Sequence, residues 1–168
     1  MLIEPAWITT IDHLDQLVAI LRQPPALSRI FSRFVIPPGF PFAEIPLGIL
    51  GSTRRPAVPL ASGLMELQPG LITFEARPLR LPGPVVRNLR EDMQFVLTAA
   101  DVLGIERYVG ESPFGNNFNM LFARLHTRRG GLMRDFLVCV GGGEPTMDRQ
   151  RRETSQLIAA LLQAVGGA

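Results

Sequence analysis

Two groups of arginine residues are the side chains in this chain best suited to chemistry, and that chemistry is the binding of anions. Arg54 and Arg55 stand together in a proline-containing stretch, 53–59, that is predicted to be a loop. Paired guanidinium groups suit phosphate because each offers planar, forked N–H donors. The alternative is an exposed pair without a function, since short charge runs are usually just solvated.

The second group surrounds a glycine pair at positions 130 and 131. Its members are Arg124, His126, Arg128, Arg129 and Arg134. The apolar stretches 118–127 and 132–140 predict two strands that pair around a turn at 128–131. Alternation along the first strand places residues 124, 126 and 128 on one face. Such a basic stripe could contact an acidic partner, a membrane surface or nucleic acid, or it could simply be the polar outer face of a half-buried sheet.

No catalytic or cofactor set is recognisable in the chain. The single cysteine, Cys139, excludes an internal disulfide and lies in an apolar segment, where a small core residue is expected. His13 and His126 lack any metal-ligand spacing. The chain has no lysine, so neither a Schiff base nor a Walker A motif can form. We therefore expect a protein that is not an enzyme, with no cofactor, no metal and no catalytic residue.

The acidic residues do not change this expectation. The carboxylates that could serve as general acid or base stand at four positions: Asp92, Asp101, Glu106 and Glu111. None of them has an evident partner in the sequence, and acid–base catalysis needs a group whose pKa is tuned in a cleft. They are interpreted as turn or surface residues.

Composition indicates one folded domain. Of the 168 residues, 46% are apolar and 19% are charged, as in an ordinary globule. A net charge of +2 argues against nucleic acid as the partner. The chain shows no apolar run of the roughly 18 residues that a transmembrane segment needs. Residues 1–8 do not resemble a secretory signal, so a cytoplasmic protein is expected.

Hydrophobic periodicity divides the chain at about residue 45. Apolar residues at helical spacing predict a helix over 10–23, which Pro24 and Pro25 end, and a second short helix within 26–35. From residue 45 the period becomes that of strands. Strands are predicted at 45–50, 64–67, 71–76, 95–97 and 102–109, with Gly70 at the turn of the clearest hairpin. An amphipathic helix is predicted over 147–165, with its apolar stripe at Leu157, Ile158, Leu161, Leu162 and Val165.

Three of these segments resemble the pleckstrin-homology superfold, including its bacterial and GRAM-like relatives. They are residues 63–67 with 71–74, residues 95–102, and residues 136–140 leading into the last helix. The resemblance implies an α+β, mainly antiparallel β domain. Its core would be a curved sheet or barrel of six to seven strands capped by a C-terminal helix. The whole chain, 1–168, would then be one domain, with an N-terminal helical extension at 1–44 and a pleckstrin-homology-like core at 45–168.

The resemblance and the arginines together predict a non-enzymatic binding module. It would dock onto a partner protein or an anionic lipid surface through Arg54, Arg55, Arg128 and Arg129. The N-terminal helices would pack on the barrel or mediate self-association as a homo-oligomer.

Two other functions stay open at this point. One is a small-molecule carrier, with a pocket between sheet and helix lined by Met65, Phe74, Met93, Met120 and Met133. The other is an enzyme subunit of unknown chemistry, because catalytic groups need only meet in space.

Reversing the charge of the first arginine pair tests its assignment. We expect the double substitution Arg54→Glu and Arg55→Glu to weaken binding to anionic vesicles or to the partner, because like charges repel. The midpoint of thermal unfolding should not fall, since loop arginines contribute little to stability. Vesicle co-sedimentation and a thermal melt measure the two effects, and binding equal to that of the unaltered chain would contradict the assignment.

Overall fold

A computed structural model describes residues 1–12, 15, 61–77, 93–110, 119–140 and 147–167. Within these residues the chain forms seven strands, a short 3₁₀ helix and one long helix. The elements are β1 (Leu2–Thr10), β2 (Ala61–Gln68), β3 (Leu71–Ala76), β4 (Phe95–Thr98), η1 (Ala99–Asp101), β5 (Val102–Val109), β6 (Leu121–Arg129), β7 (Leu132–Val140) and α5 (Met147–Gly166).

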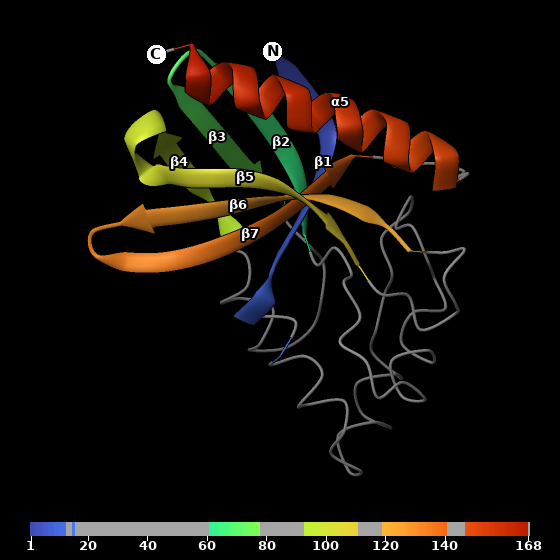
Figure 1. The fold of residues 1–168 in the computed structure, drawn as a ribbon, viewed down its shortest axis with the longest axis horizontal. Helices are drawn as coiled ribbons and strands as arrows, with labels where there is room; N and C mark the ends of the chain where they lie inside the picture. The colour runs from blue at the N-terminus through green and yellow to red at the C-terminus, as the bar shows by residue number, and fades with distance from the viewer. Residues whose placement is uncertain (13–14, 16–60, 78–92, 111–118, 141–146, 168) are drawn as a thin grey trace.

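The described strands form one antiparallel sheet in the order β4-β3-β2-β1-β7-β6-β5. The sheet curls into a half-barrel, and α5 lies across it (Figure 1). The mainly antiparallel β fold with a C-terminal helix is thus confirmed. The predicted hairpin at Gly70, whose φ is 76°, and the break at η1 between β4 and β5 are confirmed as well.

The predicted boundary at residue 45 is wrong for the start of the chain. Residues 2–10 are not part of a helical extension but form β1, which pairs with β2 on one side and β7 on the other. Ile11, Asp12 and Asp15 are helical, as the helix predicted over 10–23 requires. The rest of that helix, the segment 26–35 and the strand predicted at 45–50 lie outside the described residues.

The concave face of the sheet and α5 enclose the hydrophobic core. Alternate residues of the strands point inward, as in the row Ile8, Val138 and Ala123, all fully buried. From α5, Leu157, Ile158 and Leu161 are buried against this face, so the predicted stripe is right for them. Leu162, however, is 51% exposed and lies outside the stripe.

Small residues bring three strands close together at Gly63. Gly63 of β2 pairs with Ala6 of β1 and with Ala76 of β3. A Cβ atom added at Gly63 would lie 2.1 Å from the carbonyl oxygen of Glu75 and 2.9 Å from the ring of Phe74. Only glycine fits there without displacing backbone, so the residue type follows from the approach of the strands.

Two polar residues on the buried face of α5 tie the helix to strand ends. Gln150 Oε1 accepts a hydrogen bond from Leu121 N (3.0 Å), and Gln150 Nε2 donates to Leu121 O (2.7 Å). Thr154 Oγ1 accepts from Val140 N (3.2 Å) and donates to Val140 O (3.3 Å). Gln150 Nε2 also donates to Thr154 Oγ1 (3.0 Å). We refer to Gln150 and Thr154 as the polar clamp.

Removing the polar clamp should destabilise the fold. The substitution Gln150→Leu leaves the N–H and C=O of Leu121 buried without these partners, which costs about 1–3 kcal/mol of unfolding free energy. Gln156→Leu is the matched control, because Gln156 is exposed on the same helix and should change stability by less than about 0.5 kcal/mol. Urea unfolding of both variants measures the difference, and equal midpoints would contradict the role of the clamp.

Candidate functional site

The β6–β7 hairpin ends in a two-residue turn. Gly130 has a φ of 57° and Gly131 a φ of 82°, and Arg129 pairs with Leu132 across them. Two successive residues with positive φ are typical of a type I′ turn, whose twist matches that of the flanking strands. The predicted hairpin is confirmed. Its turn is shorter than the predicted 128–131, because Arg128 and Arg129 belong to β6.

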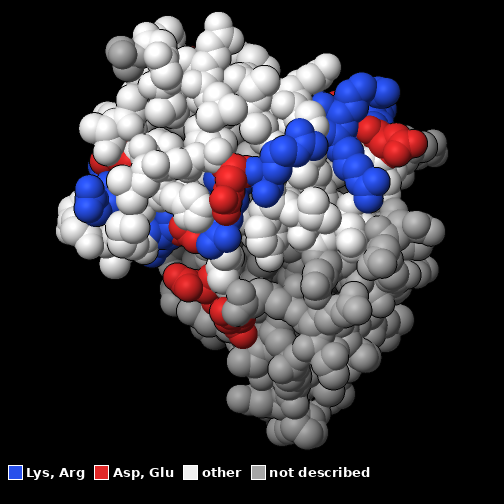
Figure 2. All heavy atoms as spheres, in the orientation of Figure 1, with Lys and Arg blue, Asp and Glu red and all other residues white. Residues whose placement is uncertain are grey.

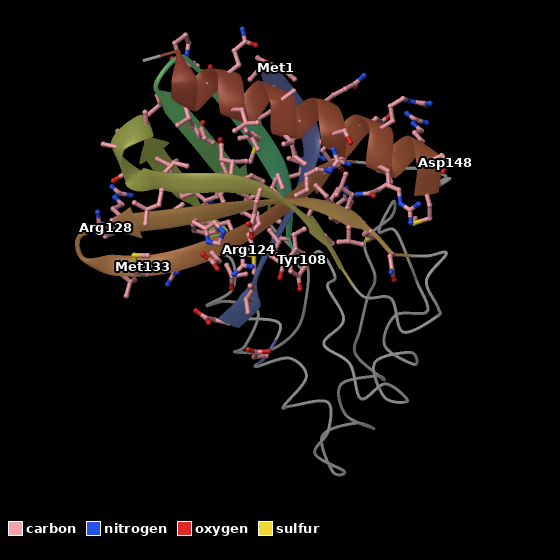
Figure 3. The ribbon with its side chains drawn as sticks, in the orientation of Figure 1. Met1, Tyr108, Arg124, Arg128, Met133 and Asp148 are labelled. Atoms are coloured by element: carbon pink, nitrogen blue, oxygen red, sulfur yellow. The ribbon has the colours of Figure 1, made fainter. Side chains whose placement is uncertain are left out.

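An ionic group lies on the convex face at the base of this hairpin. We call Glu106, Arg124, His126 and Asp135 the charge cluster; they come from β5, β6 and β7. Arg124 donates to Asp135 Oδ2 from Nε (3.1 Å) and from Nη2 (2.6 Å), and its Nη1 donates to Glu106 Oε1 (3.3 Å). Its guanidinium also lies 5.8 Å from the ring centre of Tyr108, next to which Figure 3 shows it.

His126 completes the charge cluster by contacting both carboxylates. Its Nδ1 lies 2.9 Å from Asp135 Oδ1, and its Nε2 lies 3.1 Å from Glu106 Oε1. A neutral imidazole carries one N–H, whereas an imidazolium can donate to both carboxylates together. The predicted basic stripe is therefore real in its geometry, but at Arg124 and His126 acidic side chains compensate its charge. Acidic and basic side chains accordingly touch across the middle of the face in Figure 2.

The cluster shifts the pKa values of its members. Partial burial alone would raise the pKa of Asp135, but hydrogen bonds from Arg124 and His126 outweigh it, so the net shift is downward. The hydrogen bond to Asp135 raises the pKa of Arg124. Both shifts favour the charged forms, so the pair remains ionised over the whole neutral range.

The second part of the candidate site is the hairpin tip, by which we mean residues 128–134. Arg128 is exposed and makes no ion pair with any described residue. Arg129 is also exposed, and its Nη1 donates to Val96 O of β4 (3.3 Å). The field of Arg129 further lowers the pKa of Asp101, which is held down chiefly by hydrogen bonds from Thr98. Arg129 thus bridges the seam between β6 and the β4–η1 corner.

The predicted binding residues are brought together only in part. Arg128 and Arg129 lie at one end of the sheet but point to opposite faces, since neighbours on a strand alternate. Arg54 and Arg55 lie outside the described residues, so the structure does not place them.

The structure also places the residues of the other predictions. Cys139 is a free, fully buried thiol whose pKa is raised by burial, which suits the predicted core role. Met65, Phe74, Met93 and Met120 are buried, but Met133, predicted to line a carrier pocket, is 59% exposed at the hairpin tip. Among the described residues, no group of three or more His, Cys, Asp or Glu side chains is arranged to hold a metal ion.

Asp135 is the member of the charge cluster that sequence reasoning missed, and the turn length explains why. In a two-residue turn at 130–131, paired positions are 129 with 132 and therefore 126 with 135. A four-residue turn at 128–131 moves every partner by two residues. The glycine pair itself carried the signal, because two adjacent glycines favour the shorter turn.

Comparisons with known proteins add no identity to this geometry. No protein-family model, no curated protein and no solved structure matches the chain. In the described part of the chain, none of the helices has the length and apolar character needed to cross a membrane.

The charge cluster predicts a stability effect that depends on pH. The folded-state pKa of Asp135 lies below its unfolded value, so its contribution is present above about pH 4 and is lost as pH falls through the folded pKa. We expect Asp135→Asn to lower the unfolding free energy by about 1–2 kcal/mol at pH 7, because the two charge-assisted hydrogen bonds from Arg124 are weakened.

The matched control is Glu75→Gln, an exposed carboxylate on β3. Urea unfolding from pH 7 to pH 3 should show a gap between Asp135→Asn and the unaltered chain that narrows with acid, with no such gap for Glu75→Gln. A gap that is constant over this range would contradict the electrostatic origin.

Proposed function

We propose that this chain is a non-enzymatic binding module of pleckstrin-homology-like fold that docks onto an anionic surface through the hairpin tip. The order of elements supports the fold assignment. In the described part of the chain, seven antiparallel strands curl around a core and one helix follows the last strand, as in that superfold. The strand β1, rather than the segment 45–50, takes the place of the first strand of the unit.

The observation that carries the proposal is the contrast between two sets of basic residues on one hairpin. Arg124 and His126 are held by Asp135 and Glu106, so their charge is compensated. Arg128 is exposed at the tip without such a partner in the described chain. Guanidinium groups in that state suit phosphate or carboxylate groups of a binding partner.

The shape of the hairpin supports the same conclusion. Its turn lies at one end of the molecule, and Figure 3 places Arg128 and Met133 beside it, far from Asp148 at the beginning of α5. Residues 127–134 include no acidic side chain. A projecting cationic tip can approach an anionic surface without any other part of the described sheet having to touch it.

Vesicle co-sedimentation across a salt series tests the proposal. We expect binding to vesicles of phosphatidylcholine with phosphatidylglycerol, weak binding to phosphatidylcholine alone, and weakening as salt screens the charges. Arg128→Glu should lower the vesicle partition coefficient about thirtyfold, since each basic residue near an anionic surface contributes about 1 kcal/mol and charge reversal roughly doubles that loss to about 2 kcal/mol.

Arg152→Glu is the matched control. Arg152 is exposed on α5, and the substitution changes the net charge of the chain by the same amount. Equal losses for both variants would show a response to net charge alone and contradict docking through the tip. If the chain binds to no vesicle, an anionic membrane is not its docking surface, and a partner protein is the target to search for.

A further inference from the structure

Two large apolar side chains are exposed directly beside the Gly130-Gly131 turn. Leu132 is 62% and Met133 is 59% exposed, although neither is needed for the turn itself. Val96, whose carbonyl oxygen accepts from Arg129, is 50% exposed, and Leu103 at the beginning of β5 is 46% exposed. Exposed apolar residues that gather at one end of a protein mark an interaction site more often than single scattered ones do.

The pairing of β6 with β7 divides these groups between two faces. Leu132 lies opposite Arg129, and Met133 lies opposite Arg128. Because successive residues of a strand point to opposite faces, one face of the hairpin tip carries Leu132 with Arg129 and Arg134, and the other carries Met133 with Arg128. The tip is therefore amphipathic around its whole circumference.

This arrangement distinguishes between the surfaces that the tip could meet. A flat protein surface would cover one face of the hairpin and leave the apolar residue of the other face in water. A lipid interface surrounds whatever enters it, so it covers both faces at once. Leucine and methionine would lie at the acyl boundary, and the flexible arginine stems allow the guanidinium groups to reach back to the phosphates.

From these observations we infer that the hairpin tip is a membrane wedge: residues 130–133 enter the interface of an anionic bilayer, and Arg128 and Arg129 bind its headgroup phosphates. The inference rests on the proposed function. It adds that the tip inserts into the bilayer, that it reaches the interface, and that the chain has one orientation on the membrane. The hairpin would enter turn first. The exposed arginines at the N-terminal end of α5, which lies away from the hairpin turn in Figure 1, would stay out of the contact.

A tryptophan placed at the tip reports insertion directly. In the full chain the native Trp7 is 3% exposed, so it serves as a constant background. We expect Leu132→Trp to show blue-shifted emission with phosphatidylglycerol-containing vesicles and quenching by acyl chains brominated near the headgroup. Val109→Trp is the control, because Val109 is 57% exposed at the other end of β5, about 23 Å along the strand from Val102. It should show neither effect.

A second variant keeps the test independent of the added tryptophan. The double substitution Leu132→Ser and Met133→Ser should lower the vesicle partition coefficient about tenfold at every salt concentration, because apolar burial is lost. The slope of log affinity against log salt should stay unchanged, since no charge is removed. Both positions are exposed, so circular dichroism and the thermal midpoint should match those of the unaltered chain.

The outcomes separate this inference from the function on which it rests. The wedge is supported by quenching of the tryptophan at position 132 but not at 109. It also requires that the partition coefficient of the double variant is lowered by the same factor at every salt concentration. Salt-sensitive binding without quenching at 132, or with an unaffected double variant, overturns the wedge and leaves surface docking intact. Absence of binding to anionic vesicles overturns both.

Discussion

The hydrogen bonds of the polar clamp are the interactions on which the rest of the structure depends. The ladder between β6 and β7 runs from Arg129 and Leu132 to Ala123 and Val138, and no pairing follows toward the other end of the two strands. There Leu121 presents buried backbone groups and Val140 presents partly buried ones. Gln150 binds the N–H and C=O of Leu121, and Thr154 binds those of Val140. These side-chain bonds replace the hydrogen bonds that β6 and β7 no longer make with each other. The clamp thus allows the sheet to open without leaving buried polar groups unsatisfied.

The same constraint determines the direction in which the β6–β7 hairpin extends. Because α5 is anchored where β6 and β7 separate, their paired portion extends toward the opposite end and finishes in the Gly130-Gly131 turn (Figure 1). The charge cluster joins β5, β6 and β7 along the way. Ion pairs link the paired strands of this hairpin to β5, and α5 covers the end where β6 and β7 separate. These contacts allow the hairpin to carry an exposed tip without losing its register.

The sequence was sufficient for the elements whose signals are local. Glycine at the turns, alternation in β3 and the stripe of α5 predicted those elements correctly. Strand β1 was missed because its last five residues are all buried, so it shows no alternation, and its partners lie more than fifty residues away in β2 and β7. Partners of that kind depend on tertiary pairing, which periodicity in one segment does not encode. Leu162 shows the same limit, since the edge of a helical stripe is decided by what covers it.

The charge cluster and the hairpin tip divide the arginines of β6 into one that is paired with carboxylates and two that carry no ion pair with a described residue. Glu106 and Asp135 compensate the positive charge at the base, so the uncompensated positive charge of this hairpin lies at its tip. Salt screens the attraction between exposed charges that lie more than roughly 10 Å apart. A basic group would therefore contribute to attraction by an anionic surface only when it comes within about that distance of the surface. The exposed arginines of α5 begin at the other end of a helix that is about 30 Å long. Charge compensation at the base therefore leaves this hairpin with one cationic end, its tip, and in the proposed docking mode that end would fix the orientation of the chain on an anionic surface.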